Sequence, residues 1–139
     1  MHISTEQMAQ INDNPLYRTI GLRAVSATEG RVVSELLPHD NVCWPFPGQP
    51  HGGILFTQMD STMAWAVLTA YGEESSCTTV NLEIQYPSPA QGPIFTCEAT
   101  VVHRTGRTCF VRGESRDEEG RLVAMGQGTF RIIKVKPHW

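Results

Sequence analysis

The sequence predicts an α+β fold in which one long helix is wrapped by a curved antiparallel sheet of five to six strands. A helical period appears in one long stretch, where a single apolar stripe is formed by Leu55, Phe56, Met59, Met63, Ala66, Val67 and Ala70. After Gly72 the period changes to two, which is typical of strands. Ala64, Trp65 and Leu68 make the far side of the helix apolar as well, so we expect the sheet to enclose the helix. One helix beside a run of antiparallel strands is an α+β arrangement.

The first 25 residues are expected to begin with a short N-terminal helix. Residues 4–12 fit an amphipathic helix in which Ser4 or Thr5 is the N-cap. The run Asn-Asp-Asn-Pro at 12–15 predicts the end of this helix. Residues 16–25 mix apolar and polar side chains without a clear period, so no element is assigned to them.

A strand and a proline-rich loop are predicted before the long helix. Residues 31–37 alternate loosely between apolar and polar side chains, which favours a strand. Residues 38–50 contain four prolines, and because proline disrupts helices and sheets they are expected to form a loop. The long helix is expected to follow the Gly-Gly pair at 52–53 and to end at Gly72.

Four strands are expected after the helix. They cover residues 78–85, 94–103, 108–115 and 122–135. Short polar turns separate the last three strands, so these three are expected to form a meander of hairpins. The whole chain, residues 1–139, is long enough for one domain with a real core, whereas two domains would each have a marginal core.

Composition excludes several classes of protein. The hydrophobic share of 40% and the charged share of 18% exclude a disordered chain. A formal charge of −3 and scattered Lys and Arg residues give no electrostatic reason to expect nucleic acid as a partner. The sequence lacks the ~18–20 uninterrupted apolar residues of a membrane-spanning helix, and its first residues do not resemble a secretory signal. We therefore expect a cytoplasmic protein with no membrane partner.

The cysteines and histidines predict neither a disulfide framework nor a metal site. Cys43, Cys77, Cys97 and Cys109 are widely separated and form no Cys-x-x-Cys pair. Without an export signal, the simplest interpretation is that all four are reduced thiols that behave as small apolar side chains. The histidines show no zinc-ligand spacing, so no metal is expected.

One segment combines three features that suit chemistry on a carbonyl group. Gly52 and Gly53 precede the long helix, so their backbone N–H groups can approach a ligand at the positive end of the helix dipole. Donors placed there can stabilise an oxyanion that forms only in the transition state. His51 stands directly before them, and Asp60 lies at the edge of the apolar stripe. A lone His or helical Asp is more often structural, but the combination favours attack on a carbonyl.

Asp60 can act as a general base only if it is ionised. Its apolar neighbours Phe56, Met59 and Met63 disfavour a charged carboxylate. N–H or hydroxyl donors must therefore offset that cost.

The same segment resembles a known family. The His-Gly-Gly motif at 51–53 followed by Asp60 is similar to the signature of hotdog-fold acyl-CoA thioesterases of the phenylacetate-degradation (PaaI-like) group. The resemblance covers most of the chain. It includes three later segments that resemble the strand, hairpin and final strand of that family: residues 80–90 (VNLEIQYPSPA), 101–107 (VVHRTGR) and 126–130 (GQGTF).

The resemblance implies a hotdog fold, an acyl-CoA substrate and no cofactor. It also implies a homodimer or a dimer of dimers, with active sites between subunits. By position, the Gly52 N–H would polarise the thioester C=O, with His51 beside the sulfur and Gly53 lining the substrate site. Asp60 of the partner subunit would be the general base for water or, alternatively, a nucleophile that forms an anhydride. Thr79 would help to hold the attacking water.

One position departs from the family pattern. Relatives commonly place an Asn six residues before the His as a second carbonyl donor, and here that position is Pro45, which has no donor. Asn41 is assigned this role if residues 42–50 contain a short insertion.

Four further residues are assigned to substrate binding. Trp44 and Phe46 could line an acyl tunnel or pack on the partner subunit. Arg104 and Arg107 could contact the phosphates of coenzyme A or form a solvated hairpin tip. Aryl and medium-chain acyl groups are both compatible with the sequence.

Two other functions stay open. Residues 46–50 (FPGQP) resemble a segment of hotdog hydroxyacyl-carrier-protein dehydratases, but the catalytic His of those enzymes falls at Pro45 and their Glu at Met59. A non-catalytic acyl-CoA-binding hotdog module would keep the fold and the pocket, but it would not need Asp60.

Overall fold

The computed structural model describes residues 4–72 and 75–134 of the chain. In chain order the elements are α1 (Thr5–Asn12), α2 (Pro15–Ile20), β1 (Leu22–Thr28), β2 (Arg31–Leu36), the short 3-10 helix η1 (Asp40–Val42), α3 (Gly52–Tyr71), β3 (Ser75–Gln85), β4 (Phe95–Thr105), β5 (Thr108–Asp117) and β6 (Leu122–Lys134). Within these ranges, no helix combines the length and apolar character needed to cross a bilayer.

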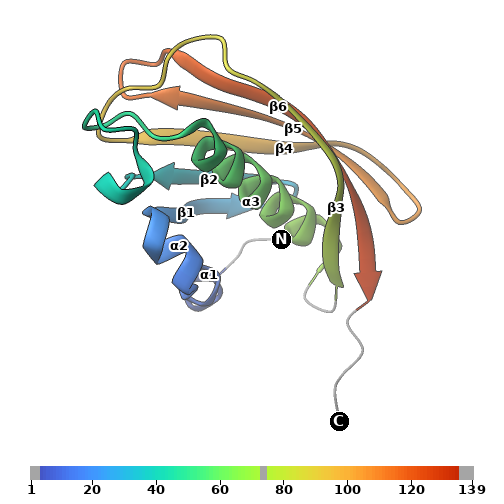
Figure 1. Ribbon diagram of the computed structural model, residues 1–139. Coiled ribbons are helices and arrows are strands. Elements are labelled where there is room, and N and C mark those ends of the chain that lie inside the picture. The colour runs from blue at the N-terminus through green and yellow to red at the C-terminus, as the bar shows by residue number, and fades with distance from the viewer. Residues whose placement is uncertain (1–3, 73–74, 135–139) are drawn as a thin grey trace.

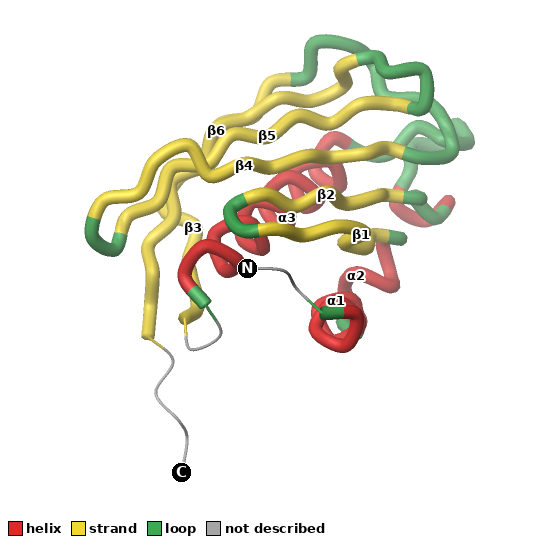
Figure 2. The backbone as a smooth tube through the Cα atoms, turned by 180° about the vertical axis from the view of Figure 1, so that it is seen from behind, coloured by secondary structure: helices red, strands yellow, loops and turns green. Residues whose placement is uncertain are grey.

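The six strands form one antiparallel sheet that curves around α3. Their order is β1-β2-β4-β5-β6-β3, so β1 and β3 are the edge strands and β4, β5 and β6 form the expected meander. Figure 1 shows α3 along the concave side of the sheet, with α1 and α2 beside β1. Seen from behind in Figure 2, the outer face of the sheet is not covered by any helix of the described ranges. The predicted α+β hotdog architecture is confirmed, with six strands.

Helix α3 fits into the concave side because its central methionines lie against glycines of the sheet. Met59 and Met63 are fully buried. A Cβ atom on Gly113 would meet the Met59 sulfur, and one on Gly128 would lie 2.8 Å from the Met63 sulfur. Gly126 also faces Met59, at 3.6 Å. Positions without a side chain therefore let the sheet backbone approach the helix closely.

Replacing Gly126 by alanine is expected to lower the free energy of unfolding by about 1–3 kcal/mol, the usual cost of overpacking a core. The added Cβ would lie 2.7 Å from the backbone oxygen of Glu83 on β3, and this backbone is held by its pairing with β6. Gly113→Ala is the matched control, because its Cβ would meet chiefly the flexible Met59 side chain. Urea denaturation followed by circular dichroism measures both variants. A larger loss for Gly113→Ala would contradict this explanation.

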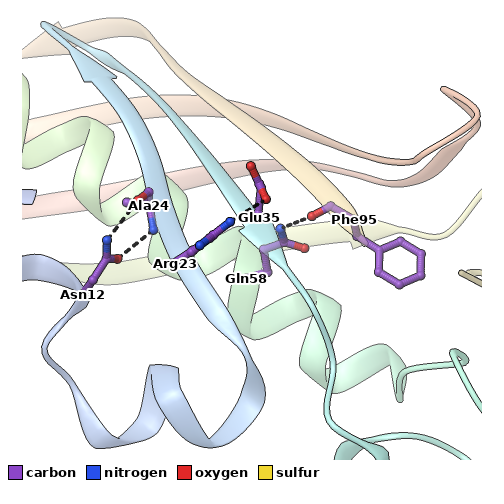
Figure 3. A network of polar contacts seen from close by, with 6 residues as sticks. All are labelled: Asn12, Arg23, Ala24, Glu35, Gln58 and Phe95. Carbon is purple, nitrogen blue, oxygen red and sulfur yellow. Dashed lines mark hydrogen bonds and ion pairs between the residues drawn. The ribbon is translucent and has the colours of Figure 1, made fainter. Parts of the chain in front are cut away.

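Two polar side chains, Asn12 and Gln58, are hydrogen-bonded to backbone groups of other elements (Figure 3). Gln58 on α3 is fully buried, and its Nε2 donates to the Phe95 carbonyl oxygen at 3.1 Å. Asn12, at the end of α1, makes two hydrogen bonds with the backbone of Ala24, at 2.8 and 3.0 Å. Helix α1 is thereby tied to edge strand β1.

Residues 16–25 contain two elements that the sequence pattern did not reveal. Asn14 caps α2 by accepting a hydrogen bond from the Leu16 N–H, and Pro15 occupies the first helical position. Gly21 ends the helix with φ of 84°, a backbone conformation that favours glycine. The chain then enters β1 directly. A six-residue helix followed at once by a strand is too short a segment for the helical period, or the strand period of two, to be recognised in the sequence.

The other predicted elements lie close to their expected positions, but η1 lies in the expected loop, and α3 begins at Gly52 and so includes the Gly-Gly pair expected to precede it. Helix α1 has Ser4 as its N-cap, and β2 matches the strand expected at 31–37. Strand β3 begins at Ser75, earlier than expected, and β4 and β5 extend beyond their expected ends. The predicted last strand is β6, and its expected final residue, Val135, lies outside the described residues.

Candidate active site

The first turn of α3 is capped by the side chain of His51. Its backbone is extended (φ −58°, ψ 141°), and its Nδ1 accepts a hydrogen bond from the Gly53 N–H at 2.8 Å. A Cβ atom at position 53 would lie 3.0 Å from Nδ1, which is tighter than an ordinary contact. A side chain at position 53 would therefore require the His51 ring to shift by a few tenths of an ångström. The Gly53 amide, assigned above to the substrate site, is already bonded within the chain.

Gly52 presents the amide that the sequence analysis assigns to the oxyanion. It is the first residue of α3, and within the described ranges its N–H has no acceptor. Such N–H groups carry the positive end of the helix dipole. The Gly52 carbonyl accepts a hydrogen bond from the Tyr86 hydroxyl at 2.7 Å. Sequence reasoning gave Tyr86 no role, because no local pattern relates two positions 34 residues apart.

The proline-rich loop folds back on itself beside His51. A β-bridge joins Cys43 to Pro50, and the Val42 carbonyl accepts a hydrogen bond from the His51 N–H at 3.1 Å. The residues between the bridged pair thus form a closed loop. Asn41 is exposed and directly precedes the residue that is bonded to His51.

Besides Tyr86, three exposed aromatic side chains lie at or near this end of α3. Trp44 is 51% exposed. The centroid of its ring lies 5.0 Å from the centroid of the His51 ring, with an interplanar angle of 34°. Phe46, in the same loop, is 61% exposed. Phe56 was expected on the buried stripe, but it is 36% exposed, whereas Leu55 beside it is buried. In its first turns, the buried face of α3 therefore leaves out Phe56 and includes the polar Gln58.

The carboxylate of Asp60 is held by a hydroxyl group of an edge strand. Thr79 Oγ1 donates to Asp60 Oδ1 at 2.6 Å. Asp60 is half-buried and Thr79 is exposed. A β-bulge lies between Thr79 and Asn81 in the pairing of β3 with β6, and bulges change the direction of side chains. The structure thus supplies a hydroxyl donor of the kind that a charged Asp60 requires.

Burial and the nearby Asp60 carboxylate raise the pKa of the Cys77 thiol to about 11. Because the thiolate is the reactive form, Cys77 is expected to be alkylated at pH 8 roughly 10²-fold more slowly than an ordinary cysteine. Asp60→Asn removes the negative charge and is expected to lower the pKa of Cys77 and to speed its alkylation. Alkylation rates from pH 7 to pH 11, read by mass spectrometry, check both statements. An unchanged Cys77 rate in Asp60→Asn would contradict the electrostatic contact.

One chain holds Gly52 and Asp60 at two separate places along α3. The two residues are eight positions apart, which corresponds to about 12 Å along the helix axis. A thioester carbonyl and one attacking water do not span that distance. A site that uses both groups therefore needs a second copy of the chain.

Arg104 lies near the opposite end of α3, and Arg107 follows it in the hairpin between β4 and β5. The Arg104 guanidinium donates to the Ala70 carbonyl at 2.6 Å and lies 4.9 Å from the centre of the Tyr71 ring. Arg107 is exposed between β4 and β5. In the part of the chain that the structure describes, no three His, Cys, Asp or Glu side chains are grouped closely enough to hold a metal ion.

Comparison with known proteins agrees with this architecture. The sequence profile of the thioesterase superfamily matches residues 48–124. A protein of Halobacterium salinarum, whose name describes an unconfirmed esterase, is 28% identical over 135 residues, which cover 89% of this chain and 88% of that protein. The family match and this name support a hydrolase.

Solved structures share the fold. A conserved protein of Pseudomonas aeruginosa is 30% identical, with a TM-score of 0.82 over 94% of this chain and 100% of that one. The PaaI protein of the phenylacetic acid degradation operon of E. coli has a TM-score of 0.79 at 21% identity, over 90% of this chain and 88% of that one. The profile covers more than half of the sequence, including the His-Gly-Gly motif, Asp60 and Thr79. The chain therefore belongs to the thioesterase superfamily.

Proposed function

We propose that this chain hydrolyses the thioester of an aryl- or medium-chain acyl-CoA at sites shared between two copies. The observation that carries the proposal is the position of Asp60, whose carboxylate is bonded to Thr79 at a sheet edge and lies about 12 Å along α3 from Gly52. A second copy that brings its own Gly52 to Asp60 would complete the site. Membership of the thioesterase superfamily supports the reaction class.

Edge strand β3 is the surface to which we assign the second copy. It is 11 residues long and pairs with β6 on one side only within the described chain. All of its residues are exposed or half-buried, and Val80 is 62% exposed. A long unpaired edge is a template for another strand, so two β3 strands would join two sheets. This homodimer, alone or as half of a dimer of dimers, would have Thr79 and Asp60 at its interface.

The proposed reaction is addition of water to the thioester carbonyl followed by loss of the thiolate. Asp60 of the partner subunit takes a proton from water as the water oxygen bonds to the carbonyl carbon, and the Gly52 N–H donates to the oxyanion that forms. The oxyanion collapses, the C–S bond breaks, and the proton on Asp60 passes to the thiolate of coenzyme A. Water is the only co-reactant, so no cofactor is required. In the alternative, the carboxylate attacks first and water hydrolyses the resulting anhydride.

Residues around the two helix ends are assigned to substrate contacts. Asn41 is proposed as the second donor to the carbonyl oxygen, in place of the side chain that Pro45 lacks. Trp44 and Phe46, both largely exposed, would contact the acyl group. Arg107 is the better candidate for a phosphate of coenzyme A, because the guanidinium of Arg104 is bonded to the helix end.

A free-thiol assay over a panel of aryl- and alkyl-acyl-CoA thioesters, run beside the Asp60→Asn protein, tests the proposal. Thiol release that is lost in the variant supports it. Release that survives the substitution would assign hydrolysis to another site. Binding of acyl-CoA without release of thiol from any thioester would favour the non-catalytic module.

A further inference from the structure

We infer that Tyr86, through the peptide group that joins Gly52 to Gly53, strengthens the hydrogen bond that keeps the proton of the His51 imidazole on Nε2. The inference deepens the proposed function and rests on it for its catalytic meaning. The position of the proton itself follows from hydrogen bonds within the chain.

The relay consists of two hydrogen bonds to one peptide group. The Tyr86 hydroxyl donates to the Gly52 carbonyl at 2.7 Å, and the N–H of the same peptide, on Gly53, donates to His51 Nδ1 at 2.8 Å. A hydrogen bond to the oxygen of a peptide polarises the group and strengthens its N–H as a donor. Tyr86 is therefore a positioning residue that acts on His51 through the peptide.

The second hydrogen bond determines the tautomer of His51. Because Nδ1 accepts an N–H, it carries no proton in the neutral ring, and the ring proton is on Nε2. The Trp44 ring, whose centroid lies 5.0 Å from that of the imidazole, restricts the orientation of the imidazole. A Cβ at position 53 would press on this ring at 3.0 Å, so glycine at that position preserves the arrangement.

In the proposed reaction, this tautomer makes His51 a donor. Its Nε2–H would donate a hydrogen bond to the thioester sulfur and then to the departing thiolate, whereas the opposite tautomer would present a lone pair to both. The β3 region would then organise both parts of the site. Thr79, within β3, holds Asp60, and Tyr86, directly after β3, acts on His51.

Long-range proton–nitrogen NMR spectra of isotope-labelled protein, recorded at alkaline pH, distinguish the two tautomers. In the wild-type protein, His51 is expected to be in the Nε2–H form. Tyr86→Phe keeps the ring and deletes the hydroxyl. As the Nδ1–H form becomes populated, the chemical shifts of the two His51 ring nitrogens are expected to move towards each other. Hydrogen exchange of the Gly53 amide is expected to become roughly two- to tenfold faster.

Tyr17→Phe is the matched control, because it makes the same chemical change in a ring that packs edge-on against Trp65 at 5.0 Å. It is expected to change neither signal. An Nδ1–H ring in the wild-type protein would overturn the inference, and so would unchanged His51 and Gly53 signals in Tyr86→Phe. Both signals come from the protein without substrate. Failure of the relay is therefore distinguishable from failure of the thioesterase assignment.

Discussion

Asp60→Asn is expected to lower kcat by roughly 10²–10⁴-fold, the contribution of a positioned general base. Asparagine keeps the shape of the side chain, and its amide oxygen can still accept the hydrogen bond that Thr79 donates to Asp60 at 2.6 Å. The substitution removes the carboxylate that takes the proton from water. The fold is expected to survive, because the contact between α3 and β3 is retained.

Thiol-release rates and circular dichroism spectra of the wild-type and variant proteins measure this effect. Asp13→Asn is the matched control. It makes the same change at an exposed position, where Asp13 pairs with Arg18 at 2.6 Å, and exposed ion pairs contribute little to stability. The control is expected to keep wild-type turnover. If Asp60→Asn also stays within a few-fold of wild type, Asp60 has no part in the mechanism.

Gly52→Pro is expected to lower kcat by roughly 10²–10³-fold, the usual loss when one oxyanion donor is removed. Proline has no N–H, yet it suits the first position of a helix, and Gly52 is the first residue of α3. The residue before a proline must be extended, and His51 already has φ −58° and ψ 141°. The substitution therefore deletes the donor with little strain.

Gly52→Ala separates loss of the amide from added bulk. A Cβ at this position would lie 3.4–3.6 Å from atoms of the Tyr86 side chain, which is ordinary contact, and alanine keeps the N–H. Its kcat in the thiol-release assay is expected to stay much closer to wild type than that of Gly52→Pro. Equal losses in the two variants would show that the Gly52 amide is not the donor.

The parts of the site that could be predicted are those that depend on local spacing. The His-Gly-Gly motif and Asp60 lie in one helical segment, so the helical period alone places the carboxylate at the edge of the buried face. The structure finds Asp60 half-buried, in agreement with that position. The role of Thr79 was inferred only from the family resemblance, because its contact with Asp60 depends on how β3 lies beside α3.

Contacts between distant segments could not be predicted in this way. Tyr86 meets Gly52 across 34 residues, and the two positions share no periodic pattern. Gln58 is polar in the middle of the helix, yet it is fully buried, with its Nε2 bonded to the Phe95 carbonyl and the Ser34 hydroxyl. A helical wheel ranks residues by hydrophobicity and contains no information about such partners. The strand pattern likewise predicted the strands that follow α3, but it did not indicate that β3 pairs with β6.

Mixing two inactive variants tests most directly whether two copies share each site. In a heterodimer of an Asp60→Asn chain and a Gly52→Pro chain, one site combines an intact Gly52 with the intact Asp60 of the partner subunit, and the other site contains both substitutions. Equal co-expression with random pairing makes half of the dimers mixed, so about a quarter of wild-type turnover per subunit is expected. No recovery above the separate variants would contradict a shared site.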